Sequence, residues 1–203
     1  MYDLRGRVGY IAEILTCKMS VHRGLFRIYM PFYPGGTLHT IQSNLAGPYQ
    51  GPNAWVPGSF MWYCAEVLAT VGLVMQQGDL SQFPNPVSKW PPILHRDLKL
   101  ENVLLGEPLP HPYSRFLTPT LCDFGISAYN RQEGTHPRGQ DGNVGTKWET
   151  APEQHSDQFG QHSSKSDVWA VGCCLARLMS KHRDITAVGD DSDRRYWSRS
   201  SRY

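Results

Sequence analysis

Four polar residues between positions 97 and 123 have side chains suited to chemistry on a charged group. Asp97 and Asn102 are separated by four residues in the stretch HRDLKLENVLL (95–105), with Lys99 between them, and Asp123 follows in the stretch CDFG. Carboxylate and amide oxygens are hard ligands that suit a divalent cation such as Mg²⁺. A carboxylate can also accept a proton from an attacking hydroxyl group. Taken alone, an Asp–Asn pair on a loop is more typical of a turn, so the assignment depends on the surrounding motifs.

The surrounding motifs occur in one order along the chain, and they decide the interpretation. A second HRD triplet at 182–184 has Thr186 and Gly189 where the first copy has its lysine and asparagine, and we interpret it as chance. The first copy is preceded by Ile28–Tyr33 and Gly35–Leu38, and it is followed by Asp123–Gly125, Gly145–Thr146, Ala151–Glu153, Ser166–Trp169 and Gly172. From about Val8 to Met179 this ordered set resembles the hinge, catalytic loop, DFG, APE and central-helix motifs of eukaryotic protein kinases.

The resemblance implies an α+β fold that is protein-kinase-like but incomplete: a remnant of the small-lobe sheet and the first half of a mainly helical large lobe. It also implies ATP and Mg²⁺ as cofactors and a protein hydroxyl group as the acceptor. Asp97 would orient the attacking hydroxyl, Lys99 would neutralise charge on the transferring phosphate, and Asn102 with Asp123 would hold the metal. The lysine two residues after Asp97, together with Thr146, favours the Ser/Thr type over the tyrosine type.

The segment Met30–Tyr33 resembles the hinge that contacts the adenine of ATP. Met30 would be the gatekeeper, and the Pro31 carbonyl with the Tyr33 N–H and carbonyl would form the hydrogen bonds. Pro31 replaces the usual glutamate, and it keeps its carbonyl but has no N–H. The alternative is a plain edge strand that ends in a turn. The full set of predicted ATP-binding residues is Met30, Pro31, Tyr33, Lys99, Asn102 and Asp123.

The segment from Phe124 and Gly125 to Glu153 resembles an activation segment. Arg96 resembles the arginine that receives an activation-loop phosphate, and we hypothesise that a phosphate on Thr135 orders the segment by pairing with it. Unchanged activity after Thr135→Ala would contradict this hypothesis, and the alternative is that Arg96 simply packs. In the family the APE glutamate, here Glu153, pairs with an arginine further along the chain. No helix that could carry such an arginine is readable in 181–203.

Hydrophobic periodicity predicts the elements that must position these residues. Val8–Cys17 and Leu25–Tyr33 are apolar and partly alternating, which predicts two strands joined by a turn. Ser59 is predicted to cap a helix that runs to about Gln77, with an apolar face typical of a core helix. That face contains Phe60, Tyr63, Cys64, Val67, Leu68, Val71 and Met75.

Further elements are expected on either side of the catalytic stretch. A short helix is predicted at 37–44 and a short strand at 120–124, whereas 125–152 is predicted to be a long surface loop. Residues 109–119 resemble an insertion, to which we assign no role. Ser166 and Asp167 open an apolar helix whose only charge before Met179 is Arg177. A helix that is apolar all round is typical of a buried position, and here part of its cover would be missing.

The sequence lacks several features that a complete kinase domain would have. Gly6-x-x-Gly9 is only a fragment of a glycine-rich loop, and Lys18 is the only lysine before the hinge, where a solvated turn residue is expected. We therefore divide the chain into a partial kinase domain at 1–180 and a tail at 181–203 that is predicted to be disordered. Within the domain, 1–33 would be the last small-lobe strands with the hinge, and 34–180 the large lobe.

Composition restricts the class of protein further. The 203 residues carry a net charge of +2, which implies no strong attraction to nucleic acid or anionic membranes. The five cysteines form no CxxC pair, so free thiols are expected and a structural zinc site is not. No secretory signal is recognisable, and the most apolar stretch, 65–75, is too short to span a bilayer. These observations predict a cytoplasmic or nuclear protein whose partners are ATP and a protein substrate with Ser or Thr.

Three functional hypotheses remain open. The first is an ATP-dependent protein Ser/Thr kinase seen as a truncated domain, which the four residues Asp97, Lys99, Asn102 and Asp123 favour. The second is an inactive pseudokinase or binding fragment, which the missing glycine-rich loop and small-lobe lysine favour. The third is a truncated product that does not fold, which the abrupt change in composition at Lys181 favours.

Overall fold

The computed structural model describes residues 9–45, 55–81, 83–110, 112–130, 144–146, 148–155 and 162–180. These residues form three α-helices, α1 (Leu38–Leu45), α2 (Gly58–Gln77) and α3 (Ser164–Met179). They also form six short strands: β1 (Thr16–Ser20), β2 (Leu25–Tyr29), β3 (Ile93–Leu94), β4 (Val103–Gly106), β5 (Thr118–Leu121) and β6 (Ala128–Tyr129). Three 3₁₀ turns complete the described elements: η1 (Val21–Arg23), η2 (Leu100–Asn102) and η3 (Pro152–His155). The α+β composition agrees with the sequence prediction.

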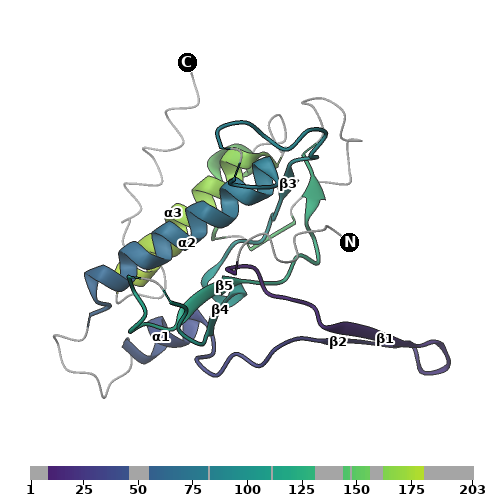
Figure 1. Cartoon of the computed structure of the whole chain (residues 1–203), viewed down its shortest axis with the longest axis horizontal. Helices are drawn as coiled ribbons and strands as arrows, with labels where there is room; N and C mark the ends of the chain where they lie inside the picture. Colours follow the sequence, from purple (N-terminus) through teal and green to yellow (C-terminus); the bar gives the residue numbers. More distant parts are fainter. Residues whose placement is uncertain are drawn as a thin grey trace.

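Helix α2 is the centre of the hydrophobic core, and α3 lies beside it (Figure 1). All seven residues of the predicted apolar face are buried, and Val74 is buried with them. They pack against Ala170, Cys174 and Leu178 of α3 and against buried residues of β4 and β5. Residues three and four positions apart share one face of a helix, which is why the sequence alone identified this surface.

The start of α2 differs from the prediction. Pro57 occupies the cap position, Ser59 lies inside the helix, and the Ser59 hydroxyl accepts a hydrogen bond from Arg115. The Pro57 carbonyl accepts from Phe60 N at 2.9 Å and from Met61 N at 3.0 Å, so backbone bonds close the first turn without a side-chain cap. By length and composition alone, Gly58–Gln77 is also long and apolar enough to cross a membrane, which the shorter stretch 65–75 did not indicate. Core helices pass the same test, and the buried face of α2 belongs to the core.

The antiparallel pair β4–β5 is extended on both sides by segments from the first forty residues. Ala12 N donates to Leu121 O, and Leu121 N donates to Tyr10 O. On the other side Gly35 N donates to Leu105 O, and Leu105 N donates to Gly36 O. These backbone bonds fix residues 10–12 against β5 and residues 35–36 against β4. The described residues from β3 to α3, which include the predicted catalytic loop, are called the catalytic half of the chain below.

The first predicted strand is therefore wrong in its bounds. Only Thr16 and Cys17 of the predicted 8–17 strand belong to β1, which runs on to Ser20 and pairs with β2, and β2 itself ends at Tyr29. Tyr10 and Ile11 pack instead against the core cluster, so burial decides their position. The hairpin β1–β2 projects away from the helices (Figure 1), and all ten of its strand residues are exposed. A lone two-stranded hairpin has marginal stability in water.

The stretch 109–119, predicted as an insertion without a role, includes the start of β5, and two of its aromatic rings cover part of α2. The Tyr113 ring stacks on Tyr63 with centroids 5.0 Å apart, and Phe116 lies 5.3 Å from Phe60. Such aromatic pairs stabilise a fold beyond the area that they bury. The segment connects β4 to β5, two of the strands that the sequence analysis did not place correctly.

Helix α3 begins at Ser164, two residues before the predicted start. The Ser163 hydroxyl accepts from Lys165 N and the Ser166 hydroxyl lies 3.0 Å from Ser163 N, which together form a capping box. One face packs on α2, whereas Val168 is 70% exposed and Met179 is 65% exposed. The helix is therefore not buried on every side, which differs from the fully buried position that its apolar sequence predicts.

We predict opposite effects for two glycine-to-alanine substitutions near the same helix. Gly78 has φ +85°, and a Cβ atom there would lie 2.5 Å from the Trp90 ring. Gly78→Ala should therefore destabilise the chain by about 2–4 kcal/mol, from backbone strain plus overpacking. Gly72, inside α2, has open space around its Cβ position. Gly72→Ala should stabilise the chain by about 0.5–1 kcal/mol. Urea unfolding measures both, and equal destabilisation by the two variants would contradict this prediction.

Candidate active site

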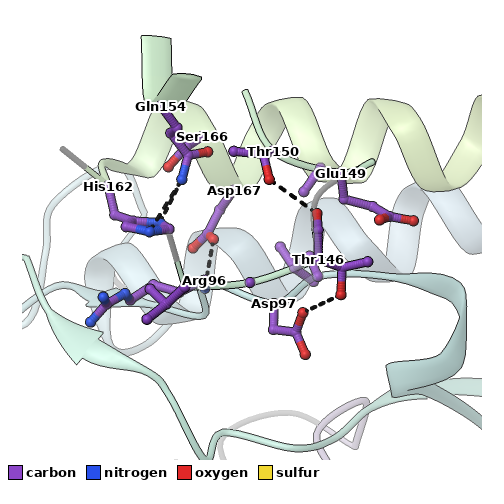
Figure 2. A pocket seen from close by; sticks show the side chains of 13 residues that line it. Arg96, Asp97, Thr146, Glu149, Thr150, Gln154, His162, Ser166 and Asp167 are labelled. Carbon is purple, nitrogen blue, oxygen red and sulfur yellow. Dashed lines mark hydrogen bonds between the residues drawn. The ribbon is translucent and has the colours of Figure 1, made fainter. Parts of the chain in front are cut away.

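The catalytic stretch is attached to α3 through one buried carboxylate. Asp167 Oδ2 accepts from His95 N at 2.8 Å, and Asp167 Oδ1 accepts from Arg96 N at 3.0 Å (Figure 2). Arg96 has φ +73°, a conformation that is uncommon for a residue with a side chain. The two hydrogen bonds hold this strained backbone in place, and they fix the start of the loop that carries Asp97.

His95 is a buried neutral imidazole in this arrangement. Burial lowers the pKa of His95, and this effect outweighs the nearby carboxylates of Asp167, Asp97 and Asp123. Asp97 N donates to His95 Nδ1 at 3.3 Å, so Nε2 carries the proton and donates to Cys122 O at 3.0 Å. The His95 ring also lies edge-on to Phe124, with centroids 4.7 Å apart. His95 thus joins the catalytic stretch to the DFG stretch.

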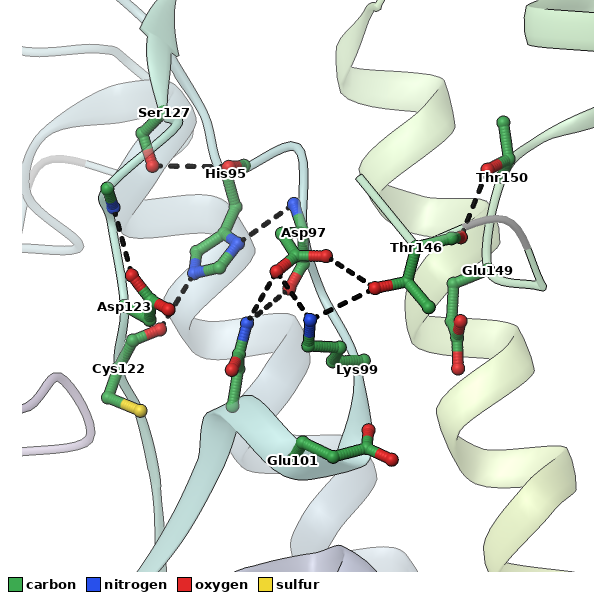
Figure 3. A network of polar contacts seen from close by, with 12 residues as sticks. His95, Asp97, Lys99, Glu101, Cys122, Asp123, Ser127, Thr146, Glu149 and Thr150 are labelled. Carbon is green, nitrogen blue, oxygen red and sulfur yellow. Dashed lines mark hydrogen bonds and ion pairs between the residues drawn. The ribbon is translucent and has the colours of Figure 1, made fainter. Parts of the chain in front are cut away.

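The Asp97 carboxylate is the centre of a polar network that contains four of the predicted site residues (Figure 3). Lys99 Nζ donates to Asp97 Oδ2 at 2.7 Å, and Asn102 Nδ2 donates to the same oxygen at 3.0 Å. The Thr146 hydroxyl donates to Asp97 Oδ1 at 2.8 Å and accepts from Lys99 Nζ at 3.0 Å. Residues 97, 99 and 102 are therefore brought together with Thr146, which comes from the predicted activation segment.

These donors determine the charge of Asp97. Burial raises the pKa of Asp97, but the hydrogen bonds from Lys99, Thr146 and Asn102 and the charge of Lys99 together lower it below its usual value. The side chain is 14% exposed, so the carboxylate is held in place and still reaches solvent. An ionised carboxylate with a fixed orientation can accept a hydrogen bond from an incoming hydroxyl group.

Gly145 allows Thr146 to reach Asp97. Its φ is +97°, and a Cβ atom at this position would lie 2.5 Å from the Arg96 carbonyl oxygen. Any side chain would therefore push the segment away from the catalytic stretch. The sequence analysis placed Gly145 in a Gly–Thr motif, and the structure gives the physical reason for the glycine.

Asn102 and Asp123 present the oxygen atoms that a Mg²⁺ ion would need. Asn102 uses its amide nitrogen for Asp97, which leaves its amide oxygen as a ligand, and its backbone carbonyl accepts from Cys122 N at 2.9 Å. Asp123 is exposed with φ +61°, and one carboxylate oxygen accepts from Gly125 N at 3.2 Å. Hard oxygen donors on two neighbouring segments fit the ligand preference of Mg²⁺. Among the described residues, no cluster of three or more His, Cys, Asp or Glu side chains could hold a metal.

The predicted hinge lies between the exposed hairpin and α1. Met30 and Pro31 are exposed, and Tyr33 is half-buried with its ring 3.3 Å from the Cβ position of Gly106. The Tyr33 carbonyl accepts from Gly36 N at 3.3 Å, which makes a turn at the point where the chain joins β4. Burial raises the pKa of Tyr33. The structure thus places Tyr33 at the edge of the catalytic half and leaves Met30 and Pro31 in solvent.

A small pocket lies between the catalytic stretch, described residues of 144–154 and the start of α3. Its lining includes Arg96, Gln154, His162 and Asp167, and Gln154 Nε2 lies 2.9 Å from His162 Nδ1 (Figure 2). Thr135, the predicted partner of Arg96, lies outside the described residues. Gly125 is exposed just after Phe124. Glu153 lies in η3, where it forms no ion pair with the part of the chain that the structure describes.

Three charged residues of this region were not among the predicted site residues. Arg177 of α3 forms an ion pair with Glu149 and a second one with Glu101, 3.3 Å away. A lone charge inside an apolar helix needs a partner of opposite charge when the helix is buried. The sequence could therefore have predicted an acidic partner for Arg177. Its partners lie 28 and 76 positions away, and neither belongs to a recognisable motif.

The comparisons with known proteins converge on one family. A sequence model of the protein kinase domain matches residues 89–199, which is more than half of the chain and continues beyond Met179. The chain is 36% identical over 96 residues to the mouse tyrosine-protein kinase Fgr, a match that covers 44% of this chain and 15% of that protein.

Two further relatives are protein kinases by name. The chain is 34% identical over 88 residues to the mitogen-activated protein kinase mpk-1 of Caenorhabditis elegans, which covers 43% of this chain and 18% of that protein. It is 28% identical over 194 residues to the G2-specific protein kinase nim-1 of Neurospora crassa, which covers 89% of this chain and 20% of that protein. The chain therefore spans a fifth or less of the length of these relatives.

We predict that Lys99 controls the titration of Asp97. Lys99→Met should raise the pKa of Asp97 more than Thr146→Val does, because a charged donor favours the carboxylate more than a neutral donor. Because folding lowers the pKa of Asp97, the ionised carboxylate contributes to the free energy of unfolding above its unfolded pKa. This contribution is lost as the pH falls through the folded pKa. Lys99→Met should make the loss smaller, because it brings the folded and unfolded pKa values closer together. Carboxyl ¹³C NMR measures the titration.

The exposed Lys165 provides the matched control for this titration. Lys165→Met should leave the Asp97 titration unchanged. An unchanged Asp97 pKa in Lys99→Met would contradict the network drawn in Figure 3.

Proposed function

Since this chain belongs to the protein kinase family, we propose that it transfers the γ-phosphate of ATP to a Ser or Thr hydroxyl of a protein substrate. The observation that carries the proposal is the Asp97 carboxylate, which is ionised and held by Lys99, Asn102 and Thr146 in one network. Phosphoryl transfer requires positioning and charge neutralisation rather than covalent chemistry by the protein. A fixed carboxylate beside a lysine and two oxygen ligands provides both.

Each residue of the network has a separate part in this reaction. Asp97 would accept or orient the proton of the substrate hydroxyl, because its lowered pKa leaves it ionised near neutral pH. Lys99 lies between Asp97 and Thr146, where its charge would neutralise the transferring phosphate. When bound, Mg²⁺ supplies charge neutralisation at the phosphates of the nucleotide. The Asn102 amide oxygen and the Asp123 carboxylate would hold the ion.

The preference for Ser and Thr is supported by the contact between Lys99 and Thr146. The lysine occupies the position that resembles Ser/Thr kinases, and its hydrogen bond to Thr146 gives both residues a place beside the acceptor hydroxyl. The names of the relatives include both tyrosine and other protein kinases, so they support the family more strongly than the preference.

The nucleotide would approach from the hinge side. We propose that the Pro31 carbonyl and the Tyr33 backbone bind the adenine and that Met30 is the gatekeeper residue beside it. The tie between Gly35 and Leu105 holds this segment next to the catalytic half of the chain. We further propose that Arg96 forms an ion pair with a phosphate group carried by Thr135, that residues 1–180 form the kinase portion, and that the protein acts in the cytoplasm or nucleus.

A non-catalytic binding module is the second candidate, and the position of Lys18 favours it. Lys18 is exposed on β1, with its ammonium group 5.7 Å from the centroid of the Tyr29 ring on the same hairpin. A kinase needs a small-lobe lysine that pairs with the phosphates. Lys18 is exposed on the hairpin, so nucleotide binding must be measured separately from phosphate transfer.

We predict that Mg²⁺ with an ATP analogue stabilises the full 203-residue chain through Asp123. At a nucleotide concentration of 100 times Kd, mass action gives about 2.7 kcal/mol of stabilisation. Asp123→Ala should remove this effect, which a thermal shift assay measures, whereas the loop variant Asp79→Ala should retain it. No shift in the unsubstituted chain would contradict the proposed nucleotide site.

We predict that Asp97→Asn retains nucleotide binding and loses phosphate transfer. The amide keeps the size of the carboxylate but cannot accept a proton, so kcat should fall by about 10²–10⁴-fold. Transfer of ³²P from labelled ATP to a generic protein substrate measures this change. If the unsubstituted chain binds nucleotide but transfers no phosphate, the binding-module candidate replaces the kinase proposal.

A further inference from the structure

Arg177 links two parts of the molecule that meet at Asp97. Its Nη1 donates to Glu149 Oε1 of the activation segment, and its Nη2 donates to Glu101 Oε1 at 3.3 Å. Glu101 lies in η2, directly before Asn102. The Arg177 side chain is 14% exposed and the Glu149 side chain 4%, so this ion pair is largely removed from water. A charged group in that position needs its partner far more than a surface residue does.

Glu149 is rigidly connected to the hydroxyl that contacts Asp97. Glu149 N donates to Thr146 O at 3.0 Å, and the Thr150 hydroxyl donates to the same carbonyl at 3.0 Å. The Thr146 side chain donates to Asp97 Oδ1 at 2.8 Å (Figure 3). Thr146, Glu149 and Thr150 are thus bound to one another, with Thr146 attached to Asp97 and Glu149 attached to Arg177.

Helix α3 provides the fixed support for these residues. Ala170, Cys174 and Leu178 are buried against α2, and Asp167 binds the catalytic stretch ten residues before Arg177. Ten helical residues span about 15 Å, so the helix contacts the site at two separated points. Gln42 of α1 also donates to the Arg177 carbonyl at 3.2 Å, which fixes this end of α3.

We propose that Arg177 is a positioning residue that holds Thr146 against Asp97 by bridging Glu149 and Glu101. Its effect on phosphate transfer rests on the proposed kinase function, whereas its effect on the position of residues 144–150 does not. Arginine suits this role because its planar fork can bind two carboxylates at once, and a lysine provides a single point charge.

The local charges show why the bridge matters. Glu149 is faced by Arg177 of α3, by Glu101 of η2 and by Lys99 of the catalytic stretch, and His39 of α1 lies 3.1 Å from Glu101. Burial raises the pKa of Glu149, while Arg177 lowers it and Glu101 raises it. Without Arg177 the two carboxylates would face each other without the guanidinium between them. Glu149 would then lose its ion pair with α3.

Hydrogen exchange on the full 203-residue chain tests the proposal without any need for activity. Arg177→Met should increase exchange at residues 144–150 by about 10–100-fold, because local opening no longer breaks a buried ion pair. Exchange in α2 should stay the same. Arg177→Lys should restore part of the protection, since a lysine can bind one of the two carboxylates. Arg27→Met, which removes an exposed arginine of β2, is the matched control and should change neither region.

The double variant Arg177→Met with Glu149→Met separates positioning from packing. It replaces the buried pair by apolar side chains, so the fold should be at least as stable as in the single variant while 144–150 stays unprotected. If Arg177→Met does not fold, Arg177→Lys and the double variant are measured in its place. Unchanged exchange at 144–150, or an equal increase in α2, would overturn the proposal.

Kinetics adds a readout that a merely structural role would not produce. With an active chain, Arg177→Met should lower kcat about tenfold and leave the KM for ATP unchanged, because Thr146 contacts Asp97 rather than the predicted hinge. A matching rise in the KM for ATP would overturn the proposal. If the unsubstituted chain is inactive, the kinase proposal fails, and hydrogen exchange alone decides the position of Arg177.

Discussion

The buried carboxylate of Asp167 is the interaction on which the site depends. A buried carboxylate is costly unless donors surround it, and Asp167 receives the backbone N–H groups of His95 and Arg96. These bonds hold Arg96 in an uncommon backbone conformation, which turns the chain so that Asp97 leaves the core and still reaches solvent. The same helix reaches the activation segment through Arg177. Helix α3 is therefore the common support of the catalytic stretch and of Thr146.

Asp97 can be fixed so closely because every neighbour has a second attachment. Lys99 binds Thr146 as well as Asp97, and Asn102 also donates to the Asp97 carbonyl. His95 accepts from Asp97 N and donates to the Cys122 carbonyl, so the DFG stretch belongs to the same network. Polar networks of this kind are stable in a low dielectric only when their members find partners. The position of the Asp97 carboxylate is consequently set by the catalytic stretch, the DFG stretch, Thr146 and α3 together.

Two features of the structure could be predicted from the sequence, one from hydrophobic periodicity and one from the order of the motifs. The buried face of α2 followed from helical spacing, and the grouping of Asp97, Lys99 and Asn102 followed from a motif whose members lie within six residues. The bounds of β1 and the start of α2 were wrong, because Ile11 packs on the core and Ser59 binds Arg115. Such contacts between distant segments are absent from local pattern. The pairing of Arg177 with Glu149 was missed for the same reason, although a lone arginine in an apolar helix was visible.

The region around Asp97 packs on the hydrophobic core, whereas the hairpin β1–β2 is exposed and is attached to the core through backbone hydrogen bonds. The groups that hold Asp97 come from residues 95–167, and their supporting core is built from α2, α3 and the strands β4 and β5. The hairpin β1–β2 contributes no buried residue to that core, and the chain after the hinge is tied to β4 by two backbone bonds. Strain in the hairpin would therefore reach Asp97 through these two bonds and through the bonds of Tyr10 and Ala12 to Leu121 on the other side of the β4–β5 pair. Of the proposed nucleotide contacts, those at the hinge thus depend on other bonds than Asp97 does, whereas Asn102 and the stretch that carries Asp123 belong to the network around Asp97.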